Sequence, residues 1–100
     1  LLMGFPTVEQ GGQCVINIIA DGIIPAGMEM MDKAAIHAAE AFCNAGYPMD
    51  AESLLIVELD GPNVEVDHLV DRVAEISKKC GALSLRASQN EEERLNFWAG

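Results

Sequence analysis

The sequence predicts a single domain of the α+β class, and three observations lead to that prediction. A length of 100 residues is room for one domain, and the 50% of hydrophobic residues is enough for one core. Strand and helix patterns alternate in the order strand, helix, strand, helix, strand, helix, strand, and a further helix trails at the end. Two strand–helix–strand units with right-handed crossovers interleave into one antiparallel sheet with helices on one face, the ferredoxin-like arrangement. That arrangement leaves the other face of the sheet uncovered.

The first strand and helix are marked by a proline and a capping pattern. Residues 1–5 are a short apolar run that ends before a proline, which is typical of a strand. Residues 7–10 have the spacing of a capping box, so a helix begins there, and it ends near Gly22. Gly11 and Gly12 lie on the apolar face of this helix, where the lack of a side chain lets the backbone approach a sheet closely.

The second strand and helix follow each other directly. Residues 26–31 form an extended segment after a proline, and Asp32 is the expected N-cap of an alanine-rich helix. This helix runs from residue 33 to about residue 45, where Gly46 stops it.

The second half of the chain predicts a strand, a helix and a strand before the trailing helix. Residues 53–60 contain an apolar run bounded by turn residues, so we expect a strand that is buried on most of its length. Asn63 is the expected cap of the helix with the most regular apolar spacing, and Gly81 ends that helix. Residues 83–88 alternate between apolar and polar as a half-buried strand does. Asn90 then begins a helix that the end of the chain truncates.

The charge and the cysteines narrow the possible partners and location. Six Lys and Arg oppose sixteen Asp and Glu, so a net charge of -10 disfavours nucleic acid and anionic membranes as partners. No apolar stretch approaches the roughly 20 residues of a membrane-spanning helix. The first residues form neither a signal peptide nor a natural start, so we expect a piece of a longer protein. The cysteines are scattered without a paired motif and predict free thiols in a cytoplasmic protein: Cys14, Cys43 and Cys80.

The usual signatures of catalysis are absent from the sequence. It has no phosphate-binding loop, no dinucleotide fingerprint, no paired-histidine zinc motif and no nucleophile elbow. His37 and His68 have no partner at ligand spacing, so both are interpreted as structural and no metal site is predicted.

Strand alternation predicts which residues lie on the uncovered face of the sheet. If Leu55 and Val57 point to the helices, then Glu58 points the other way, and the same alternation places Glu29 and Arg86 on that face. An apolar face with two carboxylates and a guanidinium suits one wall of a small-molecule pocket. The alternatives are an ion pair on a surface sheet and contacts with a domain outside the chain.

Three segments of the sequence look familiar together. They are GIIPAGMEMMD at residues 22–32, LLIVELDG at residues 54–61 and EERLNFWAG at residues 92–100. In order and spacing over all 100 residues, the chain resembles the C-terminal substrate domain of FAD-linked oxidases, nearest to the glycolate-oxidising members of that family.

The resemblance implies an activity for the parent protein. It implies oxidation of a small 2-hydroxy acid, such as glycolate or D-lactate, in which a base takes the hydroxyl proton, hydride passes to the flavin and electrons leave through a partner. The family's substrate-carboxylate arginine is expected just beyond residue 100, and its metal-binding histidines lie further on.

The same resemblance implies a limited role for this part of the parent protein. FAD is expected to be bound mainly by a domain of the same polypeptide that is absent from this chain, and other oxidase subunits are expected as partners. The chain is then one wall of the substrate pocket, holds no catalytic residue and is inactive alone. The expected location is the cytoplasm, with peripheral attachment to the inner membrane through partner subunits as the alternative.

A second hypothesis comes from a different functional class. The same fold serves non-catalytic ligand-binding or dimerisation modules, and such a module binds a metabolite by itself. Under either hypothesis we expect the chain alone to self-associate, through an uncovered apolar face or through the trailing helix. The side chains expected to lose their cover are Met31, Leu54, Ile56, Phe97 and Trp98.

Overall fold

The chain folds as an α+β sandwich of the ferredoxin-like order. The structure is a computed structural model and describes residues 1–43, 47 and 50–88. These residues form, in chain order, β1 (Leu2–Phe5), α1 (Val8–Ala20), β2 (Gly27–Asp32), α2 (Lys33–Cys43), β3 (Ser53–Glu58), α3 (Asn63–Lys79) and β4 (Ser84–Arg86). The strands lie in the order β2-β3-β1-β4, and each neighbouring pair is antiparallel. The predicted α+β class, the antiparallel sheet and the order of elements along the chain are confirmed.

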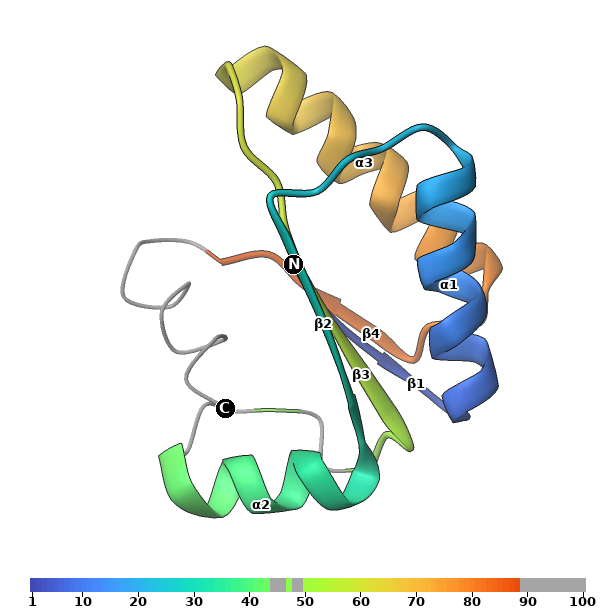
Figure 1. Cartoon of the computed structure of the whole chain (residues 1–100), viewed down its shortest axis with the longest axis vertical. Helices are drawn as coiled ribbons and strands as arrows, with labels where there is room; N and C mark the ends of the chain where they lie inside the picture. Colours follow the sequence, from blue (N-terminus) through green and yellow to red (C-terminus); the bar gives the residue numbers. More distant parts are fainter. Residues whose placement is uncertain (44–46, 48–49, 89–100) are drawn as a thin grey trace.

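Helices α1 and α3 cover one face of the sheet (Figure 1). Met3, Leu55 and Val57 point from the strands into a core that Ile18 of α1 and Val73 of α3 complete. All five side chains are almost wholly excluded from solvent. The alternation predicted for the 53–60 strand therefore has the right phase, because its odd-numbered apolar residues meet the helices.

Helix α2 lies on the opposite face of the sheet, which corrects the expectation that all helices share one face (Figure 1). Its Ile36 packs with Leu54 and Ile56 in a second core, together with Met31 and Tyr47. The reason is the connection: β2 ends at Asp32 and α2 begins at the next residue, so the helix folds onto the face to which Met31 points. Leu54 and Ile56 are 0% exposed, so the uncovered apolar face is not found.

Two of the predicted helix caps form as expected. The Thr7 hydroxyl accepts from the backbone N–H of Gln10 at 3.0 Å and donates to the side-chain oxygen of Gln10 at 2.9 Å. The Asp32 carboxylate accepts from the backbone N–H of Ala35 at 2.8 Å. Each cap satisfies a donor that the first turn of a helix leaves without a partner.

The other predicted boundaries need small corrections. The cap position of α3 is Pro62 rather than Asn63, and its carbonyl accepts from Val66. β3 ends at Glu58 because that residue pairs with Gly27, the first residue of β2. β4 is shorter than predicted because it pairs only with three residues of β1. The trailing helix expected from Asn90 lies outside the described residues.

Candidate functional site

The three residues proposed from the sequence lie on the same face of the sheet. Glu29 on β2 pairs with Ile56 on β3, and Ile56 also pairs with Leu2 on β1. Leu2 pairs on its other side with Arg86 on β4. Because residues opposite each other in an antiparallel sheet share a face, this row crosses all four strands on the face away from α1 and α3. Glu58 follows two residues after Ile56 on β3 and shares the same face.

These residues do not converge on one point. Glu29 and Glu58 are diagonal neighbours, a relation that separates side-chain origins by about 7 to 8 Å. Arg86 is three strand spacings from Glu29, or about 14 Å between backbones. Leu2 and Ile56, which lie between them, are 2% and 0% exposed. Among the described residues, the charged side chains therefore flank an apolar cluster and do not meet at one point.

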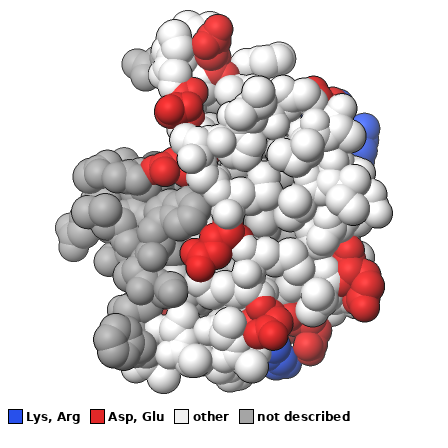
Figure 2. Space-filling model, in the orientation of Figure 1, with Lys and Arg blue, Asp and Glu red and all other residues white. Residues whose placement is uncertain are grey.

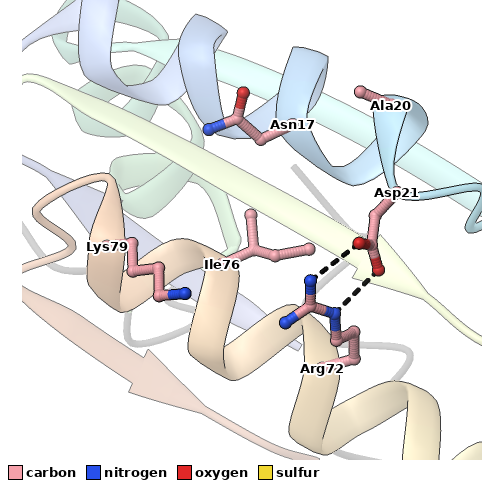
Figure 3. Close-up of a pocket in the computed structure, with 6 residues that line it drawn as sticks. All are labelled: Asn17, Ala20, Asp21, Arg72, Ile76 and Lys79. Atoms are coloured by element: carbon pink, nitrogen blue, oxygen red, sulfur yellow. Dashed lines mark hydrogen bonds and ion pairs between the residues drawn. The ribbon is translucent and has the colours of Figure 1, made fainter.

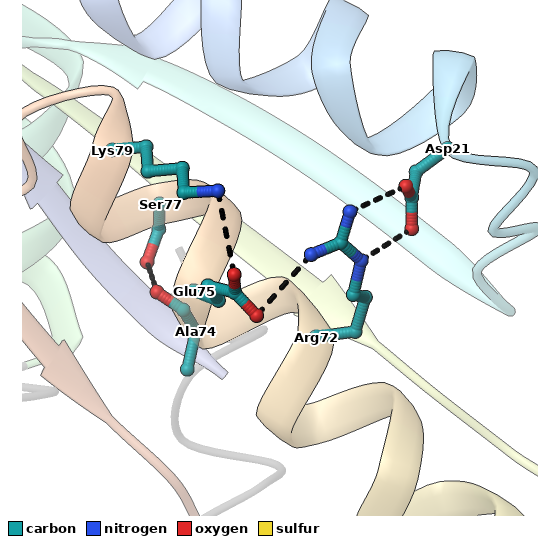
Figure 4. Close-up of polar contacts among 6 residues, drawn as sticks. All are labelled: Asp21, Arg72, Ala74, Glu75, Ser77 and Lys79. Carbon is teal, nitrogen blue, oxygen red and sulfur yellow. Dashed lines mark hydrogen bonds and ion pairs between the residues drawn. The ribbon is translucent and has the colours of Figure 1, made fainter.

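A second polar cluster joins α1 to α3 on the other side of the molecule (Figures 3 and 4). Arg72 donates from Nε to Oδ2 of Asp21 at 2.8 Å and from Nη2 to Oδ1 at 2.7 Å. Arg72 Nη1 also lies 3.2 Å from Glu75 Oε2, and Lys79 Nζ lies 3.3 Å from Glu75 Oε1. These ion pairs border a shallow groove of about 280 Å³ between the two helices.

The ion pairs determine the protonation of the carboxylates in this cluster. Hydrogen bonds from Arg72 hold the pKa of Asp21 below its ordinary value, and a hydrogen bond from Lys79 does the same for Glu75. The guanidinium of Arg72 is held by both carboxylates, so the cluster is matched in charge. We interpret it as a clamp between α1 and α3.

An apolar groove of about 550 Å³ opens where the α1–β2 connection meets the first turns of α3. Ile24 and Val64 on its rim are 89% and 82% exposed, and Glu65 and His68 line it as well. This groove was not predicted from the sequence, in which His68 is interpreted as a structural residue without a partner at ligand spacing. A signal was present in the sequence, because two isoleucines directly follow Gly22, the glycine just after the C-cap of α1.

Cys14 and Cys80 lie near each other at the α1–α3 interface. Cys14 is fully buried, and Cys80 packs against the same core cluster and accepts from Asn17 Nδ2 at 3.3 Å. Burial raises the pKa of the Cys14 thiol to about 12, and the neighbouring Cys80 thiol adds to the effect. Cys14 is thus a free thiol, as the sequence predicted, and it packs in the core as an apolar residue.

Within residues 1–43, 47 and 50–88, no three His, Cys, Asp or Glu residues lie together as a metal site would require. In the same ranges no helix has the length and apolar character needed to cross a bilayer.

Comparisons with known proteins assign the chain to a family. A family model described as FAD linked oxidases, C-terminal domain, matches residues 1–100. The whole chain is 52% identical to a glycolate oxidase subunit, GlcD, of Escherichia coli strain K12, and it covers 20% of that protein. Over 93 residues it is 34% identical to GlcD of Bacillus subtilis strain 168, covering 93% of the chain and 20% of the relative.

A more distant relative carries a second name. Over 94 residues the chain is 26% identical to a probable mitochondrial D-lactate dehydrogenase of Danio rerio, covering 94% of the chain and 18% of the relative. The chain thus spans about a fifth of the length of the curated relatives it matches.

Proposed function

The chain belongs to the C-terminal domain family of FAD-linked oxidases, and from this premise we propose that it is part of an FAD-dependent enzyme that oxidises a small 2-hydroxy acid to the 2-oxo acid. The observation that carries the proposal is 52% identity over the whole chain to a protein named as a glycolate oxidase subunit. The name of the D-lactate dehydrogenase relative supports the same substrate class, since glycolate and D-lactate are both 2-hydroxy acids.

The described residues do not fit FAD itself. The pyrophosphate of FAD requires cations or a glycine-rich helix N-terminus. Arg72 and Lys79, which border the groove between α1 and α3, are engaged by Asp21 and Glu75. The chain as a whole carries a net charge of -10, which disfavours binding of the negatively charged pyrophosphate. We assign FAD to the part of the parent polypeptide outside this chain.

The role of this chain is to form one wall of the substrate pocket, with Arg86, Glu29 and Glu58 facing the substrate. A guanidinium is the natural partner of a carboxylate because it can donate two parallel hydrogen bonds, so Arg86 supplements the arginine that the resemblance places beyond residue 100. The two glutamates lie together at the other side of the same sheet face, where a carboxylate can accept a hydrogen bond from the substrate hydroxyl. The pocket is completed by chain outside these residues.

The parent protein is proposed to act in the cytoplasm, with attachment at the inner membrane through other oxidase subunits as the alternative. The GlcD relatives are named as subunits of glycolate oxidase, which supports the proposal that the parent protein has partner subunits.

The visible spectrum of the full-length parent tests the activity. The purified protein should show an oxidised-flavin band that is lost on anaerobic mixing with glycolate or D-lactate. A yellow protein that no 2-hydroxy acid bleaches would contradict the substrate class. A colourless protein that FAD cannot restore would favour a non-catalytic module instead.

An arginine pair tests the pocket wall in the full-length parent. Arg86→Met should raise KM for the hydroxy acid about 10- to 100-fold, since a charge-assisted hydrogen bond contributes about 1.5 to 3 kcal/mol. Arg86→Lys should recover part of that loss, because it keeps the charge without the planar fork. The matched control is Arg72→Met, which removes an arginine from the opposite side of the molecule and should leave KM unchanged. An unchanged KM for Arg86→Met would remove Arg86 from the pocket.

A further inference from the structure

The apolar groove beside α3 exposes more apolar surface than the fold needs. Its floor is made by Ile23, which is buried in the core, and by Leu69, which packs against the same core. Its rim carries Ile24 and Val64, which are 89% and 82% exposed. Large apolar side chains that stand out from a hollow of this kind are typical of a protein interface.

We propose that this groove docks a segment of the parent polypeptide outside this chain, and that the segment presents an apolar side chain flanked by lysine or arginine. The inference rests on the proposed function only in so far as that makes the chain one domain of a longer enzyme. The groove lies apart from Glu29, Glu58 and Arg86, so it adds a docking surface to the proposed pocket wall.

The charge around the groove sets the chemistry of its occupant. Glu65 lines the groove, and acidic side chains gather over the N-terminal end of α3 at the top of Figure 2. Asp67 and Asp71 are exposed on the same helix outside the groove lining, so they add only to the negative field near the groove. Arg72, one turn after His68, is held by Asp21 and Glu75 and is not available to neutralise them. A segment with basic residues beside an apolar anchor complements this surface in charge and in polarity.

The position of the groove favours the same polypeptide as the source of that segment. The chain covers 20% of the GlcD relative, so 80% of such a protein lies outside it. The backbone N–H of Ala26, in the connection that forms the groove, donates to the carbonyl of Glu58 at 2.8 Å. Glu58 at the end of β3 therefore lies next to the connection that forms the groove. A domain that completes the proposed pocket beside Glu58 can extend around this end of β3 and contact the groove. A second copy is disfavoured because each copy carries a net charge of -10.

Photo-crosslinking in the full-length parent tests the docking surface. p-Benzoylphenylalanine replaces Val64, and in a control protein it replaces Gln13, an exposed polar residue of α1. We expect Val64 to crosslink within one polypeptide, to a peptide outside residues 1–100 that contains Lys or Arg, at a yield well above that of position 13. Products between two copies, products with another subunit, or a yield no higher than the control would each overturn the proposal.

Two charge substitutions supply an independent measurement. Val64→Glu in the full-length protein should lower its melting temperature by several degrees, because the new carboxylate meets a desolvated apolar contact. Ile16→Glu, at a residue that is 61% exposed on α1, is the matched control and should have little effect. Equal effects of the two substitutions would overturn the docking surface. Neither measurement depends on flavin reduction, so the two proposals can fail separately. If the parent crosslinks as expected but a hydroxy acid does not bleach its flavin, only the proposed activity is refuted.

Discussion

Gly11 allows α1 to lie directly on the buried hydroxyl of Ser53. A Cβ built at Gly11 would come 2.5 Å from Ser53 Oγ, which donates to the carbonyl of Thr7 at 2.9 Å and belongs to a fully buried residue. Gly12, the next residue, has nothing within 4 Å of such a Cβ. The sequence predicted that both glycines serve close packing, and the structure supports this for Gly11 alone.

The two glycines should therefore respond to alanine with opposite signs. Gly11→Ala should lower the free energy of unfolding by about 1 to 3 kcal/mol, because an overpacked contact must be relieved. Gly12→Ala should raise it by about 0.5 to 1 kcal/mol, because alanine is the better helix former. Urea unfolding of the two variants checks the pair. Stabilisation by Gly11→Ala would mean that α1 can move away from Ser53.

The thiols of Cys14 and Cys80 should differ in reactivity. With a pKa of about 12 and no exposed surface, Cys14 should resist alkylation in the folded protein, since only about one molecule in 10⁴ carries the thiolate at about pH 8. Cys80, which is partly exposed, should react first. Timed alkylation followed by peptide mapping separates the two sites, and urea should abolish the difference. Equal rates in the folded protein would show that α1 opens readily from the core.

At the level of elements, the clamp between α1 and α3 predicts a pH-dependent contribution to stability. Arg72 lowers the folded-state pKa of Asp21, so the pair stabilises the fold above the ordinary pKa of 3.8 and loses that effect as pH falls through the lowered value. Arg72→Met should therefore lower the urea midpoint at neutral pH, by a small amount because both side chains are partly exposed.

The same variant gives a control through pH and salt. At a pH below the lowered pKa of Asp21, where the carboxylate is protonated in both states, the midpoints of the Arg72→Met variant and the unmodified chain should converge. High salt should reduce the difference at neutral pH as well. A difference that persists at low pH would mean that the packing of the Arg72 stem, and not its charge, joins the two helices.

Local patterns predicted most of the elements but not how α2 packs. The period of two in β3 separates Leu55 and Val57 from Leu54 and Ile56 without any knowledge of the rest of the chain. The face that α2 covers depends instead on its direct connection to β2 and on a few apolar contacts, chiefly that of Ile36. An alanine-rich helix has too weak an apolar stripe to specify that face by itself.

The candidate site was predictable to a similar extent. Strand alternation placed Glu29, Glu58 and Arg86 on one face, because side-chain direction in a strand is a local property. Their separation depends on strand order, which no single strand encodes. The groove at Ile24 and Val64 was not predictable from hydrophobic spacing. Such spacing predicts that apolar residues are buried, but it does not reveal which of them remain exposed at the surface, as these two do.

At the level of the whole molecule, the association of the chain by itself should depend on salt. The face expected to mediate association is buried, since Leu54 and Ile56 are 0% exposed, and the Phe97 and Trp98 end lies outside the described residues. Exposed apolar side chains are still present elsewhere, among them Ile16, Ile24 and Val64. At low ionic strength the net charge of -10 should keep copies apart, whereas at 1 M salt the screening length falls to about 3 Å and apolar contacts should prevail.

Sedimentation velocity at two salt concentrations tests this balance. We expect a monomer at low salt and a concentration-dependent increase in size at high salt. Val64→Glu should weaken the association at high salt, because it adds charge to an exposed apolar contact. A strict monomer at high protein concentration under both conditions would contradict the prediction. It would show that the exposed apolar area is insufficient to hold two acidic copies together even when their charges are screened.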